Sequence, residues 1–145
     1  MYKKILLAYD GTREGRAAIT ECEEIANLLQ AEIHLLAVVH MPSAFFLTEG
    51  VAPDTFIEHE RQNFQEIIDE GVAILNRSGR IADGYLAFGE PVTEICRLAQ
   101  QLGADLIVLG HRKHTSIAKR WWHGSVGMNL VEHAPCSILI VVARG

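Results

Sequence analysis

Apolar positions in this chain occur either as short unbroken runs or at helical spacing. The first run, KKILLAY, is followed by Asp10, Gly11 and Thr12, as expected for a buried strand that enters a tight turn. In the next segment, apolar residues recur three and four positions apart with polar residues between them. The run AEIHLLAVVH is again short and rich in Val, Ile and Leu. Residues 1–40 therefore predict a βαβ unit.

The same alternation continues to the end of the chain. It predicts strands at residues 3–9, 31–40, 82–89, 104–110 and 136–143. It predicts helices at residues 13–30, 54–78, 90–103 and 125–134. The segment 41–53 contains two prolines and a glycine, and we expect a mobile surface loop there. Such alternation builds an α/β fold, a parallel sheet with helices on both faces.

Length and composition limit the class of protein. A chain of 145 residues that is 49% hydrophobic can bury one sizeable core, so we expect a single domain over residues 1–145. A formal net charge of −5 argues against a general nucleic-acid or membrane binder. No apolar stretch approaches the ~20 residues of a membrane span, and the N-terminus does not resemble a secretory signal. We therefore expect a cytoplasmic protein.

Positive charge is concentrated after the fourth predicted strand. Four of the 13 Lys and Arg lie between Gly110 and Gly124, where the chain has no Asp or Glu: Arg112, Lys113, Lys119 and Arg120. In open parallel sheets, ligands bind outside the carboxyl ends of the strands, near the reversal of strand order. The segments to consider are Ala8 to Thr12, Val38 to Met41, and the chain from Leu109 onward.

This basic segment has the features of an anion site. Gly110 lets a ligand approach the backbone, and Gly124 and Ser125 precede a predicted helix whose first N–H groups lack partners. The surrounding cations favour phosphate. Asp10 follows another strand, where an acceptor-only carboxylate suits a ribose hydroxyl or the amino edge of a purine. The sequence thus separates a phosphate end from a sugar and base end.

Each of these features also has a plainer explanation. Asp10 with Gly11 and Thr12 is equally suited to a turn or a helix cap, and Gly124 with Ser125 to a loop end and an N-cap. The basic segment is also consistent with a solvated face or a contact for an acidic partner.

The histidines and tryptophans near the basic segment add little. His111, His114 and His123 have no carboxylate or Cys between them, so the sequence indicates no metal site. Trp121 and Trp122 suit a hydrophobic clasp better than a base-stacking surface, and nucleic-acid binding is the weaker interpretation. Cys22, Cys96 and Cys136 are odd in number and widely spaced, which indicates no disulfide framework.

The segments KKILLAYDGT, GEPVTEICRLAQQLGADLIVLGHR and GSVGMNLVEHAPCSILIVV resemble the universal stress protein family over the whole chain. The resemblance implies a single open, Rossmann-like sheet of five parallel strands in the order 3-2-1-4-5, with helices on both faces. It also implies a dimer through the last strand. Residues 137–143 support that interface independently, because an apolar edge strand with few charges tends to pair with another chain.

ATP-binding members of the family carry a motif of Gly, two residues, Gly, nine residues, Gly and then Ser or Thr. The resemblance implies a nucleotide site that includes Asp10, Val38, Leu109, Gly110, Gly124, Ser125 and Val126. Ala8 and Gly11, at the end of the first strand, and the cations Arg112 and Lys113 complete the expected site. In it, Asp10 would contact adenine and ribose, and Val38 would contact adenine through its backbone. The chain departs from the motif where Lys113 replaces the second glycine, and the stretch from there to Gly124 is one residue longer.

Three functions follow from these observations. The first is a dimeric stress-response and signalling protein that binds ATP, with Mg²⁺, or a related adenine nucleotide. The alternative, which Lys113 favours, is a nucleotide-free interaction module that meets protein partners through the basic segment 111–123. An enzyme, at most a slow ATP hydrolase, is the weakest, because the sequence offers no positioned general base and no obvious carboxylate for Mg²⁺.

Overall fold

The structure, a computed structural model, describes residues 1–41, 54–112 and 126–143. Five parallel strands form one sheet in the order β3-β2-β1-β4-β5. The strands are β1 (Lys4–Ala8), β2 (Glu32–His40), β3 (Ala82–Gly89), β4 (Leu106–Arg112) and β5 (Ser137–Ala143). The helices are α1 (Arg13–Leu29), α2 (Asp54–Arg77), α3 (Pro91–Leu102) and α4 (Val126–His133). The expected fold and strand order are confirmed.

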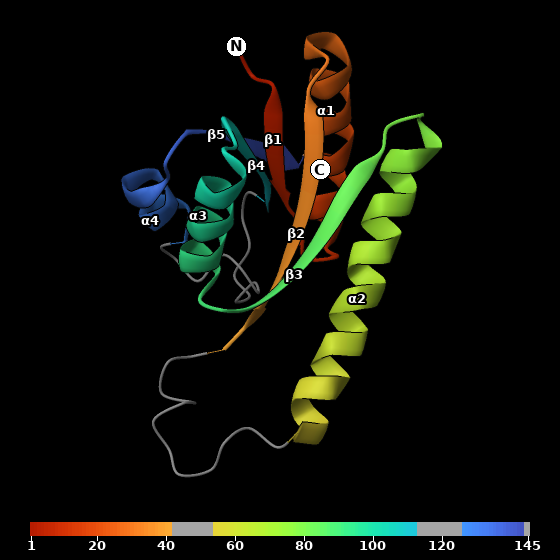
Figure 1. Cartoon of the computed structure of the whole chain (residues 1–145), viewed down its shortest axis with the longest axis vertical. Helices are drawn as coiled ribbons and strands as arrows, with labels where there is room; N and C mark the ends of the chain where they lie inside the picture. The colour runs from red at the N-terminus through yellow and green to blue at the C-terminus, as the bar shows by residue number, and fades with distance from the viewer. Residues whose placement is uncertain (42–53, 113–125, 144–145) are drawn as a thin grey trace.

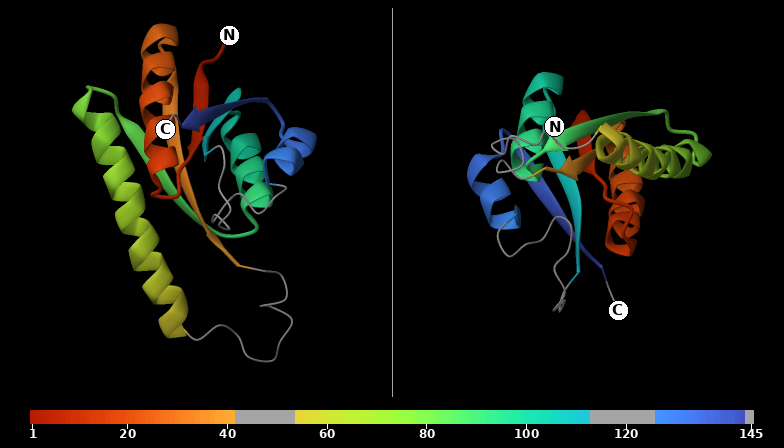
Figure 2. Two further views of the ribbon diagram at one scale, coloured as in Figure 1. Left: turned by 180° about the vertical axis from the view of Figure 1, so that it is seen from behind. Right: turned by 90° about the horizontal axis from the view of Figure 1, so that it is seen from below.

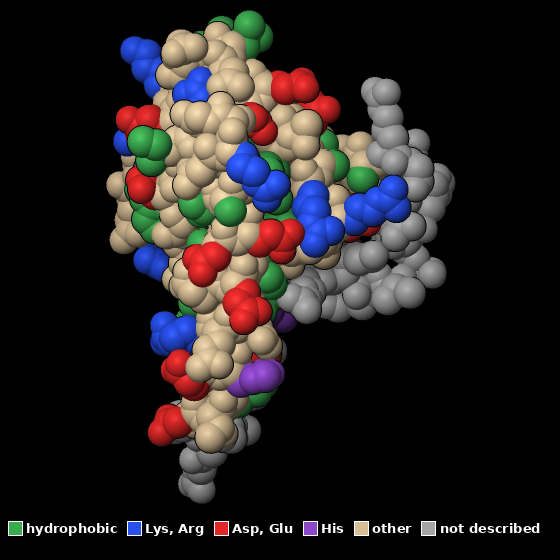
Figure 3. All heavy atoms as spheres, turned by 90° about the vertical axis from the view of Figure 1, so that its right-hand side faces the viewer, with side chains coloured by type: hydrophobic (Ala, Val, Ile, Leu, Met, Phe, Trp, Pro, Cys, Tyr) green, Lys and Arg blue, Asp and Glu red, His purple; other side chains and the backbone are tan. Residues whose placement is uncertain are grey.

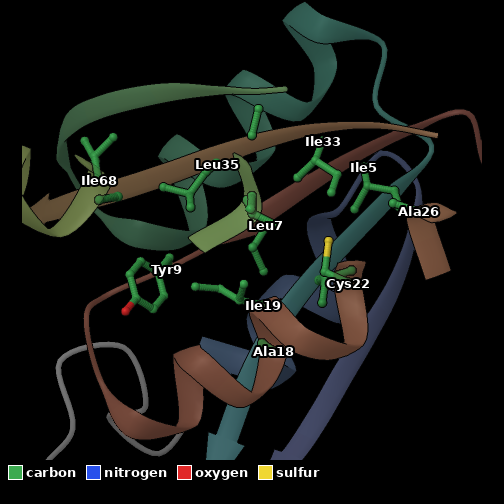
Figure 4. Packing of buried hydrophobic residues seen from close by; sticks show 14 of the residues in the cluster. Ile5, Leu7, Tyr9, Ala18, Ile19, Cys22, Ala26, Ile33, Leu35 and Ile68 are labelled. Atoms are coloured by element: carbon green, nitrogen blue, oxygen red, sulfur yellow. The ribbon is translucent and has the colours of Figure 1, made fainter. Parts of the chain in front are cut away.

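Helices cover both faces of the sheet. Figures 1 and 2 show α1 and α2 on one side and α3 and α4 on the other. Because side chains of a strand alternate between faces, each strand contributes to two separate cores. Ile5, Leu7 and Tyr9 of the β1 region pack with α1 and α2, as Figure 4 shows for part of this cluster. Leu6 and Ala8 pack on the opposite side, in the core that α3 covers.

The helix ends follow from local sequence. Thr12 precedes α1, and its side chain accepts a hydrogen bond from the Gly15 N–H at 3.1 Å. Pro91 occupies the first turn of α3, where its missing N–H leaves no hydrogen bond unmade. Gly103 ends that helix with a φ of +67°. These signals explain why the helices lie close to the residues that the sequence predicts.

The fourth strand is longer at its carboxyl end than predicted. β4 continues past Gly110 through His111 to Arg112, pairing with β5 up to Ala143. The expected basic segment 111–123 therefore begins inside the sheet, which is a correction to its boundary. The rest of that segment, and the expected loop from 42 to 53, lie outside the described residues. Met41 itself is buried, and its N–H bonds to the Gly89 carbonyl at 3.0 Å.

The surface on the α2 side of the molecule carries charges of both signs. Figure 3 shows acidic and basic side chains interspersed over the α2 side of the molecule. None of the helices in the described part of the chain has the length and apolar character that a membrane span requires.

Arg80, in the loop before β3, forms hydrogen bonds to the end of α1. These contacts lead to the first prediction. Its guanidinium donates to the carbonyls of Ala26 at 2.6 Å and Ala31 at 3.0 Å, and to Oδ1 of Asn27 at 2.7 Å. Cations are favoured at helix C-termini, and charged hydrogen bonds of this kind stabilise more than neutral ones. We expect Arg80→Ala to lower the free energy of unfolding by about 2 kcal/mol in urea denaturation. Arg80→Lys, which keeps the charge and loses the planar fork, should recover less than half; full recovery would contradict this role for the fork.

Candidate functional site

The centre of the sheet has an uneven carboxyl edge. Ala8, the last residue of β1, is level with Leu36 of β2 and Leu109 of β4. Both neighbours continue beyond that level, β2 to His40 and β4 to Arg112. The chain moves outward from β1 in one direction through β2 and β3, and in the other through β4 and β5. The reversal of strand order therefore lies at β1 and β4, where sheets of this class bind ligands.

Three expected site residues meet on one face at this edge. Ala8, Val38 and Leu109 come from three adjacent strands and belong to the same buried cluster, on the side covered by α3. Their exposed fractions are 4%, 1% and 2%. The three side chains are therefore part of the core.

Asp10 is held by the turn that follows β1. Its Oδ1 accepts hydrogen bonds from the N–H of Thr12 at 3.0 Å and from Thr12 Oγ1 at 2.6 Å. Thr12 Oγ1 in turn accepts from Gly15 N–H, so the carboxylate stabilises the start of α1. Gly11 has a φ of +80°, a conformation that favours glycine. Among the described residues, no hydrogen bond is made to Oδ2 of Asp10.

Gly110 is required by packing. A Cβ built at this position would lie 2.2 Å from the carbonyl oxygen of Glu14 and 2.6 Å from its carbonyl carbon. The missing side chain therefore lets β4 pack directly on the first turn of α1. The sequence analysis took Gly110 as a place for a ligand to approach the backbone, and the direction of its absent Cβ gives a separate structural reason for the glycine.

Other expected residues cannot be placed. Lys113, Gly124 and Ser125 lie outside the described residues. Arg112 is the last residue of β4 and Val126 the first of α4, and the structure describes their backbone only. In the part of the chain that is described, no group of three or more His, Cys, Asp and Glu residues is arranged to hold a metal ion.

Comparison with known proteins agrees with the fold. The sequence profile of the universal stress protein family matches residues 1–142. The chain belongs to the universal stress protein family. A universal stress protein of Staphylococcus haemolyticus is 30% identical over 142 residues, which cover 97% of this chain and 84% of that protein. The crystal structure of a family member from Burkholderia pseudomallei is 27% identical, with a TM-score of 0.77 and coverage of 98% of this chain and 97% of the other.

More distant universal stress proteins of the same fold have been solved with nucleotides. An Arabidopsis thaliana protein with bound AMP is 17% identical, with a TM-score of 0.71, and the match covers 99% of this chain and 93% of that one. An Archaeoglobus fulgidus protein in complex with dAMP is 19% identical, with a TM-score of 0.69 and coverage of 97% and 98%. A third, in complex with cAMP, is 19% identical, with a TM-score of 0.68 and coverage of 99% and 98%.

The structure also reveals polar contacts of this universal stress protein that the sequence pattern does not indicate. His40, the last residue of β2, has Nε2 at 3.2 Å from Oε2 of Glu90, just before α3. Tyr9 is buried between α1 and α2, and its hydroxyl donates to Oε1 of Glu70 at 3.4 Å. Arg16 donates to the same oxygen at 3.0 Å. Burial and the charge of Glu70 raise the pKa of Tyr9.

The cysteines of this universal stress protein are unsuited to nucleophilic chemistry. Burial raises the pKa of the Cys22 thiol to about 12, and it also raises the pKa of Cys96 and of Cys136. The thiolate is the reactive form, so none of the three is activated at neutral pH. The thiols thus behave as small apolar side chains.

Proposed function

We propose that this chain, folded as a single domain over residues 1–145, binds an adenine nucleotide across the carboxyl ends of β2, β1 and β4. The observation that carries the proposal is the meeting of Ala8, Val38 and Leu109 in one cluster at the reversal of strand order. Membership of the universal stress protein family supports it, as do the relatives of the same fold that hold AMP, dAMP and cAMP.

The proposed orientation places the sugar and base toward β1 and β2. Asp10 follows β1 and keeps Oδ2 for a ribose hydroxyl, while Val38 offers backbone groups to the base. The phosphates extend toward the end of β4 and the start of α4, near Gly110, Arg112, Lys113, Gly124, Ser125 and Val126 in the sequence. Positive charge and helix N–H groups favour phosphate there. The nucleotide is AMP or, with more phosphates and Mg²⁺, ATP.

The proposal further includes a homodimer that acts in the cytoplasm as a stress-response and signalling module. Strand β5 lies at the edge of the sheet, where its outer backbone groups have no neighbouring strand among the described residues. Ile140 and Val142 are 36% and 48% exposed on it. An apolar edge strand is a ready surface for pairing with a second copy. Binding of nucleotide near β4, the neighbour of β5, would give the dimer a ligand-dependent state.

Asp10→Asn is the sharpest test of the nucleotide site. The amide keeps an oxygen that can accept from both Thr12 donors, and it replaces the Oδ2 acceptor by an NH2 donor. Losing a hydrogen bond to a charged group at the ribose should weaken AMP binding roughly thirtyfold, with little change in thermal stability. A sample of the purified protein is first denatured, and any nucleotide that it releases is identified by mass spectrometry. Isothermal titration calorimetry of the folded protein with AMP and ATP then measures the affinities.

Thr12→Ala is the matched control. It removes the cap of α1 while Asp10 keeps both oxygens, so it should lower stability by about 1 kcal/mol and leave AMP affinity within about threefold. If wild-type protein binds AMP and Asp10→Asn binds it equally well, Asp10 serves only the turn. If wild-type protein neither carries nor takes up any adenine nucleotide, the proposed function is wrong.

A nucleotide-free interaction module is the second candidate. Two of the site residues have structural roles without a ligand, because Asp10 holds Thr12, the N-cap residue of α1, and Gly110 makes room for the first turn of that helix. Lys113 and the longer spacing to Gly124 also depart from the ATP-binding motif. In this case the basic segment 111–123 would meet protein partners. The calorimetric experiment separates the two candidates.

A further inference from the structure

The end of β2 presents a histidine whose position is fixed by the backbone. His40 pairs with Gly89 of β3, and the next residue, Met41, continues the ladder through its hydrogen bond to the Gly89 carbonyl. The backbone of His40 is therefore fixed by its pairing with β3 and by the hydrogen bond of the next residue. Its side chain is 39% exposed, so a ligand at the carboxyl edge can reach it.

The side chain lies on the same face of the sheet as the expected base-binding residue. Val38 belongs to the cluster covered by α3, and His40 follows it by two positions, which returns a strand side chain to the same face. The contact with Glu90, at the start of α3, agrees with this placement. The imidazole thus lies closer than Val38 to the carboxyl end of β2, in the part of that strand that extends past the end of β1.

The contact with Glu90 favours one tautomer of the His40 ring. Glu90 is the N-cap residue of α3, yet its side chain makes no capping hydrogen bond. The carboxylate instead contacts Nε2 of His40 at 3.2 Å. A carboxylate only accepts, so the contact requires a proton on Nε2, and in the tautomer protonated there Nδ1 is an acceptor. Among the described residues, Nδ1 of His40 has no hydrogen-bond partner.

We propose that Nδ1 of His40 accepts a hydrogen bond from the exocyclic amino group of the purine, so that the site selects 6-aminopurine over 6-oxopurine nucleotides. The inference rests on the proposed nucleotide site and names its specificity. A 6-oxopurine directs a carbonyl oxygen at Nδ1, which places two acceptors opposite each other. A polar group that is left without its partner in a binding site discriminates more strongly than a missing apolar contact. Glu90 acts as a positioning residue, because it orients the ring without touching the nucleotide.

The test compares AMP with IMP, which differ at the 6-position of the purine, by isothermal titration calorimetry. We expect wild-type protein to bind AMP at least roughly tenfold more tightly than IMP. His40→Phe keeps a planar ring and removes both nitrogens. It should weaken AMP binding roughly tenfold and leave IMP nearly unchanged, so that the ratio of the two dissociation constants falls toward one.

Variants of Glu90 test the positioning role. Glu90→Gln retains an oxygen that can accept from Nε2–H and should keep most of the preference for AMP, whereas Glu90→Leu should lose it. The tautomer of His40 in the ligand-free protein can be read from the ¹⁵N shifts of its ring nitrogens. We expect Nε2–H in wild type and in Glu90→Gln, and a mixture of tautomers in Glu90→Leu.

The outcomes separate this inference from the proposed function. Wild-type protein that binds AMP and IMP equally tightly overturns the role of His40 and leaves the nucleotide site standing. The same holds if His40→Phe weakens both nucleotides equally or neither. Wild-type protein that binds no nucleotide overturns both proposals.

Discussion

Replacing Gly110 by alanine is expected to lower the free energy of unfolding by about 3 kcal/mol. The new Cβ would lie 2.2 Å from the carbonyl oxygen of Glu14, well inside van der Waals contact. The obstructing atoms belong to the backbone of α1, so no change of rotamer relieves the overlap. Either α1 moves away from β4 as a unit or the strand end is distorted. Urea denaturation of the ligand-free protein measures the loss.

Gly84→Ala is the matched control for this prediction. A Cβ at Gly84 would lie 2.5 Å from Cγ2 of Ile68, which is also too close, but the obstructing atom belongs to a side chain and not to the backbone. A small shift of the Ile68 side chain can relieve part of this overlap, so the loss should be smaller, about 1–2 kcal/mol. If Gly110→Ala is no less stable than Gly84→Ala, the first turn of α1 yields easily and the packing argument fails.

The result bears on how the glycine motif is interpreted. Gly110 matches the first glycine of the motif that ATP-binding family members carry, and a glycine there usually suggests a ligand near the backbone. In this structure, the direction of the absent Cβ points to α1. A family member without nucleotide would need the same glycine. The motif match at this position is therefore weaker evidence for nucleotide than the cluster of Ala8, Val38 and Leu109.

The strands and helices could be predicted because their pattern is local. Runs such as KKILLAY and LIVLG are buried on both faces of a parallel sheet, and the helices between them repeat apolar residues at the helical period. The strand order came from the family resemblance. The carboxyl end of β4 was missed because His111 and Arg112 are polar, although both pair with β5.

The polar contacts could not be predicted because they join residues far apart in the sequence. Nothing around His40 indicates that Glu90 will face it, and nothing around Arg80 indicates the end of α1. The fold creates both contacts, one through the pairing of β2 with β3 and the other through the packing of α1 beside α2. The sequence predicted Asp10 as a site residue. Only the structure shows that its Oδ1 accepts two hydrogen bonds from Thr12, a role in the turn that needs no ligand.

The second large effect is expected at the edge of the sheet. Ile140→Lys combined with Val142→Lys places two charges on β5 at positions that are 36% and 48% exposed, so the protomer should fold normally. In a dimer through β5, the lysines of both copies would face each other across a dry interface, and charged edge strands resist pairing. We expect the dissociation constant of the dimer to rise at least about a hundredfold. Sedimentation velocity at several protein concentrations measures the change.

Leu28→Lys serves as the control for that change, because Leu28 is 83% exposed at the end of α1, at the opposite end of the strands from the proposed nucleotide site. It adds a charge to the surface without touching β5, so the dimer should be unaffected. A dimer that survives the double substitution would place the interface elsewhere, and a wild-type monomer at micromolar concentration would exclude pairing through β5. If dimer formation and nucleotide binding are linked, AMP should strengthen the wild-type dimer by the same factor by which dimer formation strengthens AMP binding.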